Sequence, residues 1–242
     1  MFAAYVLGAL SISIHPSAAP DSLVIFRAGR TYEYRAVFIN PAGDTLSRGG
    51  VTLEATGTPW AAQRKTQKAI RIHYHYTAQD SITFLVYPDP TTKRPDKPKR
   101  YSWARTHVTG AIENRQKVWF HPFRDNQYIH TEIAPFPEVW LDSLRSGGQW
   151  FNQTTISVGW GKFIGSVRST YQVVRHETRQ YGALSLPGCW LIKSVATHDK
   201  LGDSYLDFYF HPQYGFTEMH YHFFDGMRIS FVLTQATSRA NL

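Results

Sequence analysis

The chain has 242 residues, of which 15% are aromatic and 18% charged, with 26 Lys and Arg against 18 Asp and Glu. That length suits one sizeable domain, and so many aromatic residues with so few charges exclude a disordered chain. The net charge of +8 lacks the basic stripe of a nucleic-acid-binding face, so no nucleic acid is expected as a partner. The single cysteine, Cys189, excludes an intrachain disulfide framework and a Cys-based zinc site, and its apolar flank predicts a small buried side chain.

The N-terminus is typical of an export signal. An uncharged stretch, Phe2–Ile14, precedes the small residues Ser17-Ala18-Ala19, as in the apolar core and cleavage site of a signal peptide. No Lys or Arg precedes it, and Pro20 follows directly, which are two departures from the usual pattern. We predict a signal peptide over residues 1–19, a single antiparallel β domain over 20–242, and export to the periplasm or cell envelope of a bacterium. The stretch of about 13 residues is too short to span a bilayer, and no transmembrane segment is expected in the mature chain.

The first part of the domain alternates polar and apolar residues with a period of two. Thr31–Asn40, Val51–Thr56 and Ala69–Thr77 are predicted strands on this basis. A further strand over Ser81–Tyr87 is expected to pair with the preceding one through a turn at Gln79-Asp80.

The middle of the chain is less regular. Pro88–Arg100 has four prolines and five basic residues and is predicted to be a loop, because proline cannot donate to a sheet ladder. Tyr101–Val108, Arg115–His121 and Trp150–Trp160 resume strand patterns. Between them, Pro135–Leu144 is the one stretch of the body with some helical character, but it is too short for its periodicity to decide between a helix and another conformation.

The last third is an up-and-down series of strands separated by turn residues such as Asp225-Gly226. The predicted strands are Val167–Arg175, Ala183–His198, Tyr205–His211, Gly215–Phe224 and Met227–Gln235. The sequence therefore predicts an all-β fold. We expect a single curved antiparallel sheet, a half-barrel or open barrel, with at most one short helix. Such a sheet must either curl on itself or leave a cavity for an apolar ligand, and the pattern leaves both open.

Two His-Tyr-His motifs are the sharpest candidates for a site. His73 and His75 share one face of a predicted strand, and so do His220 and His222. A His-x-His pair can supply half of a zinc or copper site, and four imidazoles could converge if the two hairpins were adjacent. The alternative is a polar outward face with no cofactor. In either case the intervening residues on the other face are predicted to be core.

No enzyme signature is present: the sequence has no Gly-x-Ser-x-Gly elbow, phosphate-binding glycine loop or His-Glu-x-x-His helix. Glu132 and Glu138 lie beside aromatic residues and leave an acidic pair for sugar chemistry open. The pattern favours a protein that is not an enzyme.

The C-terminal part also resembles a known group of proteins. The residues that carry the resemblance are Trp150, Tyr171-Gln172-Val173, Glu177, Gly188-Cys189, Gly202, Tyr209-Phe210, Gly215-Phe216, Tyr221 and Asp225-Gly226. In this order they resemble uncharacterised secreted bacterial β-proteins that look like relatives of the periplasmic lipoprotein carriers. The resemblance covers Trp150 to Leu233 and implies an open half-barrel around a hydrophobic cavity, with a lipid or lipoprotein as possible partner. It carries over no catalytic residue.

Three hypotheses follow. The leading one is an exported, non-enzymatic binding protein that holds a lipid or a lipoprotein acyl chain in a curved β-sheet. The second is a metal-binding protein or metal-dependent hydrolase built on His73, His75, His220 and His222. The third is a structural envelope protein that uses the basic loop Lys93–Arg100 to contact anionic surfaces.

Overall fold

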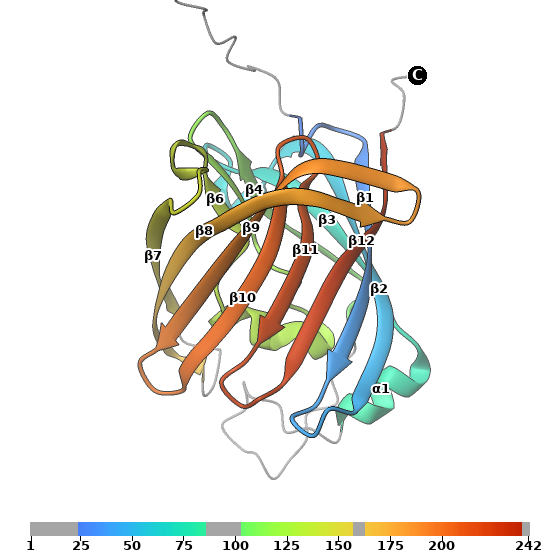
Figure 1. Cartoon of the computed structure of the whole chain (residues 1–242). Coiled ribbons are helices and arrows are strands. Elements are labelled where there is room, and N and C mark those ends of the chain that lie inside the picture. The colour runs from blue at the N-terminus through green and yellow to red at the C-terminus, as the bar shows by residue number, and fades with distance from the viewer. Residues whose placement is uncertain (1–23, 86–102, 157–162, 239–242) are drawn as a thin grey trace, which may run out of the picture.

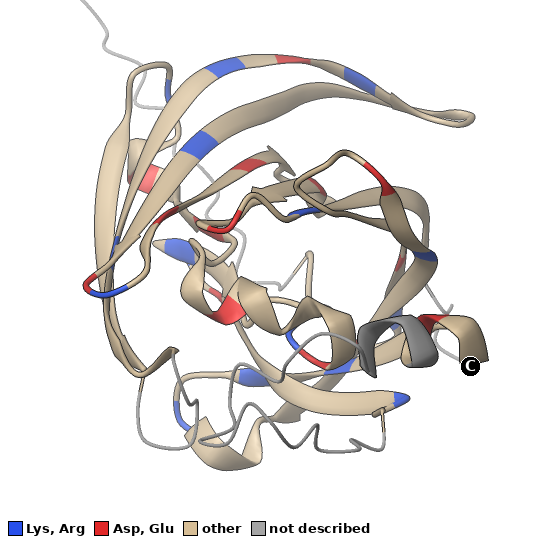
Figure 2. Ribbon diagram, turned by 90° about the horizontal axis from the view of Figure 1, so that it is seen from below, with Lys and Arg blue, Asp and Glu red and all other residues tan. Residues whose placement is uncertain are grey.

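The computed structural model describes residues 24–85, 103–156 and 163–238. Their strands form one antiparallel sheet that curves into a nearly closed barrel (Figures 1 and 2), which confirms the predicted fold class. The strands are β1 (Arg30–Ile39), β2 (Thr45–Pro59), β3 (Lys68–His75), β4 (Thr106–Glu113), β5 (Lys117–Phe120), β6 (Glu138–Trp140), β7 (Gln149–Ile156), β8 (Gly165–Tyr181), β9 (Leu184–His198), β10 (Gly202–His211), β11 (Gly215–His222) and β12 (Arg228–Ser238). The helical elements are α1 (Ala78–Leu85) and three short 3-10 helices, η1 (Ala61–Gln63), η2 (Asn126–Ile133) and η3 (Leu141–Ser143).

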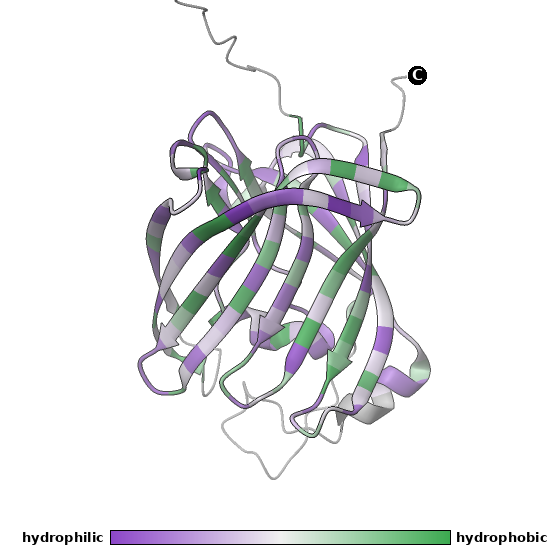
Figure 3. Cartoon of the chain, viewed as in Figure 1, coloured by the Kyte–Doolittle hydropathy of each residue, from purple (hydrophilic) through white to green (hydrophobic). Residues whose placement is uncertain are grey.

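The chain enters the sheet in its middle. The strand order is β6-β5-β4-β3-β2-β1-β12-β11-β10-β9-β8-β7, so the first six strands run to one edge and the last six return from the other. The halves join where β1 pairs with β12, as in the pair Ala36 and Phe231. Hydrophobic and hydrophilic residues alternate along the strands (Figure 3), as expected of a sheet with one face in the core.

Side chains close the gap between the edge strands β6 and β7, here called the seam. Glu138 of β6 is 1% exposed, and its carboxylate accepts a hydrogen bond from the Asn152 amide of β7 at 2.9 Å. The Tyr171 hydroxyl, from β8, donates to the Phe136 carbonyl at 3.1 Å, just before β6. Because these contacts join residues at opposite ends of the sheet order, they hold the barrel nearly closed without a backbone ladder between β6 and β7.

The interior of the barrel is packed with aromatic side chains of the chain itself. Phe123, which precedes η2, and Tyr128, which lies within it, contact the ring of Phe231 with centroid distances of 4.9 and 5.0 Å. Phe120 lies 5.3 Å from Phe216 in the same cluster. All five side chains are buried. Near η2 the sheet therefore curls around its own side chains, which was one of the two alternatives left open by the sequence.

The predicted strand over Ser81–Tyr87 is wrong, because α1 begins at Ala78. A capping box starts this helix: the Thr77 hydroxyl accepts from the Asp80 N–H at 3.1 Å, and the Asp80 carboxylate accepts from the Thr77 N–H at 2.7 Å. The motif Thr-x-x-Asp could have been read from the sequence. Here it outweighs the strand propensity of the residues that follow.

Pro135–Leu144, for which the sequence left a helix open, is not an α-helix. The stretch contains the short strand β6 and then the single turn η3. Val139 is buried and pairs with Val118 of β5, so the sheet edge determines its conformation. The predicted signal peptide (1–19) and the loop Pro88–Arg100 lie outside the described residues.

One carboxylate fastens the start of the described chain to the barrel. Both oxygens of Glu113, at the end of β4, accept hydrogen bonds from the backbone N–H groups of Val24, Ile25 and Phe26 at 2.9–3.1 Å. Ile25 and Phe26 are thereby held in the core. Hydrogen bonds to a charged acceptor are stronger than neutral ones.

We predict that Glu113→Gln lowers the free energy of unfolding by about 1.5–3 kcal/mol, because one amide oxygen cannot replace two carboxylate oxygens facing backbone donors. Urea unfolding followed by circular dichroism measures this. Glu33→Gln, at an exposed position of β1, is the matched control and should change stability by less than about 0.5 kcal/mol. Equal stability of the two variants would show that Glu113 does not anchor this segment.

Candidate ligand groove on the outer face of the barrel

The two His-Tyr-His motifs lie on the outer face of the sheet but far apart. His73 and His75 are on β3 and His220 and His222 on β11, and three strands (β2, β1 and β12) separate them. At about 4.8 Å per strand spacing, the two pairs are roughly 19 Å apart along the sheet. The four imidazoles are therefore too far apart to bind one metal ion. Among the residues that the structure describes, no group of three or more His, Cys, Asp or Glu side chains is arranged to hold a metal ion.

The residues between and beside these histidines face the core, as predicted. Ile72 and Tyr74 of β3 and Met219 and Tyr221 of β11 are buried. On the outer face of β3, the imidazole of His75 shares a hydrogen bond with the Thr52 hydroxyl at 2.9 Å. Alternation within each strand therefore placed the histidines on the correct face.

A long hairpin overhangs the outer face of the other half of the barrel. β8 and β9 pair with each other as far as Tyr181 and Leu184, whereas β9 pairs with β10 only as far as Trp190. The free end of the hairpin curves in front of the barrel wall (Figure 1) and stands off from it when the barrel is seen from below (Figure 2). Beside it, the outer face of β7–β12 forms an open groove of about 1040 Å³.

Two rows of side chains, related by cross-strand pairing, line this groove. The row nearer the hairpin, here called the polar row, is Ser230, His220, Asp207, Lys193, Gln172 and Gln149, from β12 to β7. The next row outward, the mixed row, is Arg228, His222, Tyr205, Val195, Thr170 and Phe151. Each row crosses six strands, so the groove runs across the strands for roughly 24 Å.

The mixed row changes in character from one end to the other. It begins at Arg228 on β12 and ends at Phe151 on β7, a residue that is 77% exposed. Tyr205, in between, is 46% exposed. Large apolar side chains exposed together in a concave surface are typical of a binding site. The groove thus has a cationic end and an apolar end.

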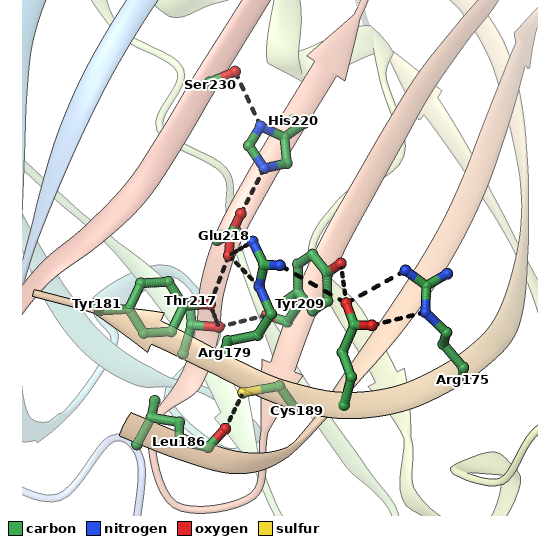
Figure 4. A network of polar contacts seen from close by, with 11 residues as sticks. Arg175, Arg179, Tyr181, Leu186, Cys189, Tyr209, Thr217, Glu218, His220 and Ser230 are labelled. Carbon is green, nitrogen blue, oxygen red and sulfur yellow. Dashed lines mark hydrogen bonds and ion pairs between the residues drawn. The ribbon is translucent and has the colours of Figure 1, made fainter. Parts of the chain in front are cut away.

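The hairpin is held over the groove by Glu218 of β11 (Figure 4). The Glu218 side chain is only 6% exposed, although it lies on the outer face. Its Oε1 accepts from Nε and Nη2 of Arg179 at 2.9 and 2.7 Å and from the Tyr181 hydroxyl at 2.8 Å. Its Oε2 lies 2.9 Å from Nε2 of His220. One side chain thus connects the hairpin to the polar row.

Further contacts reinforce this anchorage. The Arg179 guanidinium stacks over the ring of Tyr209 at 4.3 Å, and the Tyr209 hydroxyl donates to Glu177 of the hairpin at 2.6 Å. Cys189, on the hairpin, is fully buried, as predicted, and donates to the Leu186 carbonyl at 3.5 Å (Figure 4). Burial raises the pKa of the Cys189 thiol to about 11, so it is unreactive at neutral pH.

Glu218 is ionised in this setting. Burial by itself would raise the pKa of its carboxyl, but the hydrogen bonds from His220, Arg179 and Tyr181 outweigh it and hold that pKa below its ordinary value. An ionised carboxylate only accepts hydrogen bonds, and all its partners here are therefore donors.

The acidic pair left open by the sequence is engaged elsewhere. Glu138 belongs to the seam, where the Trp140 indole also donates to it at 2.6 Å. Glu132 forms an ion pair with Arg124 at 3.0 Å, and its burial raises the pKa of its carboxyl. Both side chains are thus tied into polar contacts of the barrel rather than set along the groove.

Sequence reasoning identified His220 and His222 but missed Ser230, Glu218, Arg179 and the long hairpin. Alternation places Glu218 on the face of His220, so this neighbour could have been found. The pairing of Ser230 with His220 depends on the register of β12 against β11, which the sequence pattern does not specify.

Comparison with known proteins gives only distant likeness. No family model and no curated protein matches the chain. Among solved structures, a candidate exported protein of Bacteroides fragilis with a YmcC-like fold is 8% identical, with a TM-score of 0.48 over 88% of this chain and 97% of that one. A candidate lipoprotein of Parabacteroides distasonis is 9% identical, with a TM-score of 0.47 over 89% of this chain and 100% of that one. Similarity at this level transfers no function. Among the described residues, no helix is long and apolar enough to cross a membrane.

We predict that Arg179→Met speeds amide hydrogen exchange in the hairpin about tenfold or more, because it removes two charge-assisted hydrogen bonds worth roughly 1.4 kcal/mol or more together. Exchange measured by mass spectrometry at fixed pH tests this. Arg175→Met is the matched control, since the ion pair of Arg175 with Glu177 is largely exposed, and exposed pairs contribute little. Equal protection in the two variants would contradict the assigned role of Glu218.

The anchorage should also depend on pH. A carboxyl whose pKa is lowered in the folded state contributes stability that is present above its unfolded value, about 4.5, and is lost as the pH falls through its folded value. The difference in unfolding free energy between the natural chain and Glu218→Gln should therefore be larger at pH 7 than below roughly pH 4.5. Urea titrations at each pH measure it, and a difference that grows on acidification would contradict it.

Proposed function

We propose that the protein is an exported binding protein for an anionic single-chain amphiphile, such as a long-chain fatty acid or a monoacyl lipid. The ligand lies in the groove on the outer face of β7–β12. Its charged head contacts Arg228, and its apolar chain runs across the strands toward Phe151. This places the apolar ligand predicted from the sequence on the outside of the curved sheet rather than within it.

The single observation that carries the proposal is the direction of the mixed row. Arg228 at one end, the exposed Tyr205 and the half-buried Val195 in the middle, and the exposed Phe151 at the other end match an amphiphile in charge and polarity. Arg228 is exposed and lines the groove, so its charge is available to a ligand. The packed aromatic cluster beside η2 favours the outer groove over the barrel interior.

The energetics suit reversible binding. Each methylene group that leaves water contributes about 0.8 kcal/mol, and the open groove covers the chain on one side only. A carboxylate or phosphate on a guanidinium adds a charge-assisted hydrogen bond. The net charge of +8 favours the approach of anionic ligands in general.

The apolar N-terminal stretch supports export, since Phe2–Ile14 and the small residues after it follow the pattern of a signal peptide. An exported carrier of acyl chains would act in the periplasm or cell envelope, where lipids and lipoproteins are its partners. Membership of the lipoprotein-carrier superfamily remains a prediction.

Binding of a fluorescent long-chain fatty acid tests the proposal. Phe151→Ser and Arg228→Gln should each weaken the affinity about tenfold or more, because each removes an anchor worth roughly 1.5–3 kcal/mol. Val108→Ser, an exposed apolar position on β4, is the matched control and should bind as the natural chain does. Equal binding by all four proteins would refute the groove as the site.

Native mass spectrometry of the protein from its own envelope fraction identifies the natural ligand class. A co-purifying mass of lipid size is the expected result. A mass increment of zinc or copper would instead support a metal-binding protein, and would count against an amphiphile carrier.

A further inference from the structure

Two side chains that line the groove, His220 and Ser230, form a continuous hydrogen-bonded series with the buried Glu218 at the cationic end of the groove. Nδ1 of His220 lies 3.0 Å from the Ser230 hydroxyl, and Nε2 of the same ring lies 2.9 Å from Oε2 of Glu218 (Figure 4). His220 and Ser230 are directly opposite each other on β11 and β12, and Glu218 is two residues before His220 on the same face. The register of β11 against β12 places Ser230 beside His220, and the two-residue period of β11 places Glu218 on the same face as His220.

The direction of these hydrogen bonds follows from the donors and acceptors present. The Glu218 carboxylate can only accept, so Nε2 of a neutral His220 must carry the ring proton. Nδ1 is then a bare acceptor, and the Ser230 hydroxyl must donate to it. A hydroxyl that donates to an imidazole, itself oriented by a carboxylate, is the arrangement that activates a serine as a nucleophile.

The carboxylate is held in place independently of the imidazole. Arg179 and Tyr181 fix Oε1 of Glu218 from the hairpin side, which leaves Oε2 directed at His220. The His220 side chain is 39% exposed, and both His220 and Ser230 line the groove. The buried member of the series thus orients it, and the reactive members face the ligand.

We propose that the groove hydrolyses the ester of an acyl ligand, with Ser230 as nucleophile and His220 as general base. This inference rests on the proposed function, since it needs an acyl chain in the groove with its head near Arg228. Ser230 Oγ attacks the ester carbonyl carbon while its proton passes to Nδ1 of His220, and the C=O electron pair moves onto oxygen. The C–O bond to the alcohol then breaks, and the departing oxygen takes the proton from His220.

Water completes the reaction. It attacks the acyl–Ser230 carbonyl, gives a proton to His220, and releases the fatty acid as Ser230 Oγ recovers that proton. Arg228 lies two residues before Ser230 on the same face of β12, where its guanidinium can stabilise the oxyanion. The product carboxylate would carry the charge that the cationic end of the groove favours.

A second hydroxyl–imidazole pair on the same barrel provides a matched control. Thr52 and His75 share a hydrogen bond at 2.9 Å on the outer face of β2 and β3, and no carboxylate is hydrogen-bonded to the His75 ring among the described residues. The pair has a hydroxyl and an imidazole but lacks the third member. It should therefore be unreactive.

Labelling of the full chain with an alkyl fluorophosphonate tests the nucleophile, because this probe phosphonylates activated serines. We expect one adduct, mapped by fragmentation to Ser230 and lost in Ser230→Ala. His220→Gln should slow labelling and the hydrolysis of p-nitrophenyl decanoate about 100-fold or more, whereas Thr52→Ala should change neither. Fatty-acid binding by each variant, measured in parallel, shows that the groove is intact.

The outcomes separate the two proposals. No adduct, or labelling unchanged in Ser230→Ala, together with retained fatty-acid binding overturns the esterase and leaves the binding protein. If the natural chain neither binds the fatty acid nor reacts with the probe, both the binding protein and the esterase are overturned.

Glu218 is a positioning residue in this scheme, and its test distinguishes orientation from folding. Glu218→Gln can donate to Nε2 and so reverse the imidazole tautomer, which should lower kcat by a larger factor than it changes KM. Glu218→Asp should restore part of kcat. A change in KM alone would show that Glu218 only shapes the groove.

Discussion

The requirement that governs this structure is the burial of one face of a large antiparallel sheet. No helical layer covers the sheet among the described residues, so the strands curve until the apolar face closes around aromatic side chains. Phe231 shows how complete this packing is, because it contacts rings from both the sheet and the segment around η2. Much of the interior is therefore filled by the chain's own side chains.

The outer face gains a concave surface because two strands are longer than their neighbour. β8 and β9 continue past the end of β10, and the sheet's twist carries their free end over β10–β12. A polar face that would otherwise be exposed becomes the floor of a groove beside the hairpin. Glu218 links the hairpin to the floor of the groove, since it binds Arg179 and Tyr181 on one side and His220 on the other. Any change at this carboxylate therefore acts on both the hairpin and the polar row.

Local sequence patterns predicted most of the strands and failed where two signals competed. The C-terminal meander was visible because alternation and turn residues agree over every strand, down to the turn at Asp225-Gly226. The capping box at Thr77 and Asp80 was equally local but was missed beside an apolar run. Pro135–Leu144 is too short to show a helical or strand periodicity. Its pairing with β5 determines that part of it is a strand.

By itself the sequence determined the fold class, the buried position of Cys189, and the face of each strand on which His73, His75, His220 and His222 lie. These properties follow from a period of two and from residue polarity, which act over a few residues. Tertiary structure alone decided which strands are neighbours. Strand order in turn sets the distance between the histidine pairs, the contact of Ser230 with His220, and the position of the overhanging hairpin. The reason is physical: strand order and register depend on contacts between residues far apart in the chain, and a one-residue change of register would turn every side chain of a strand to the opposite face.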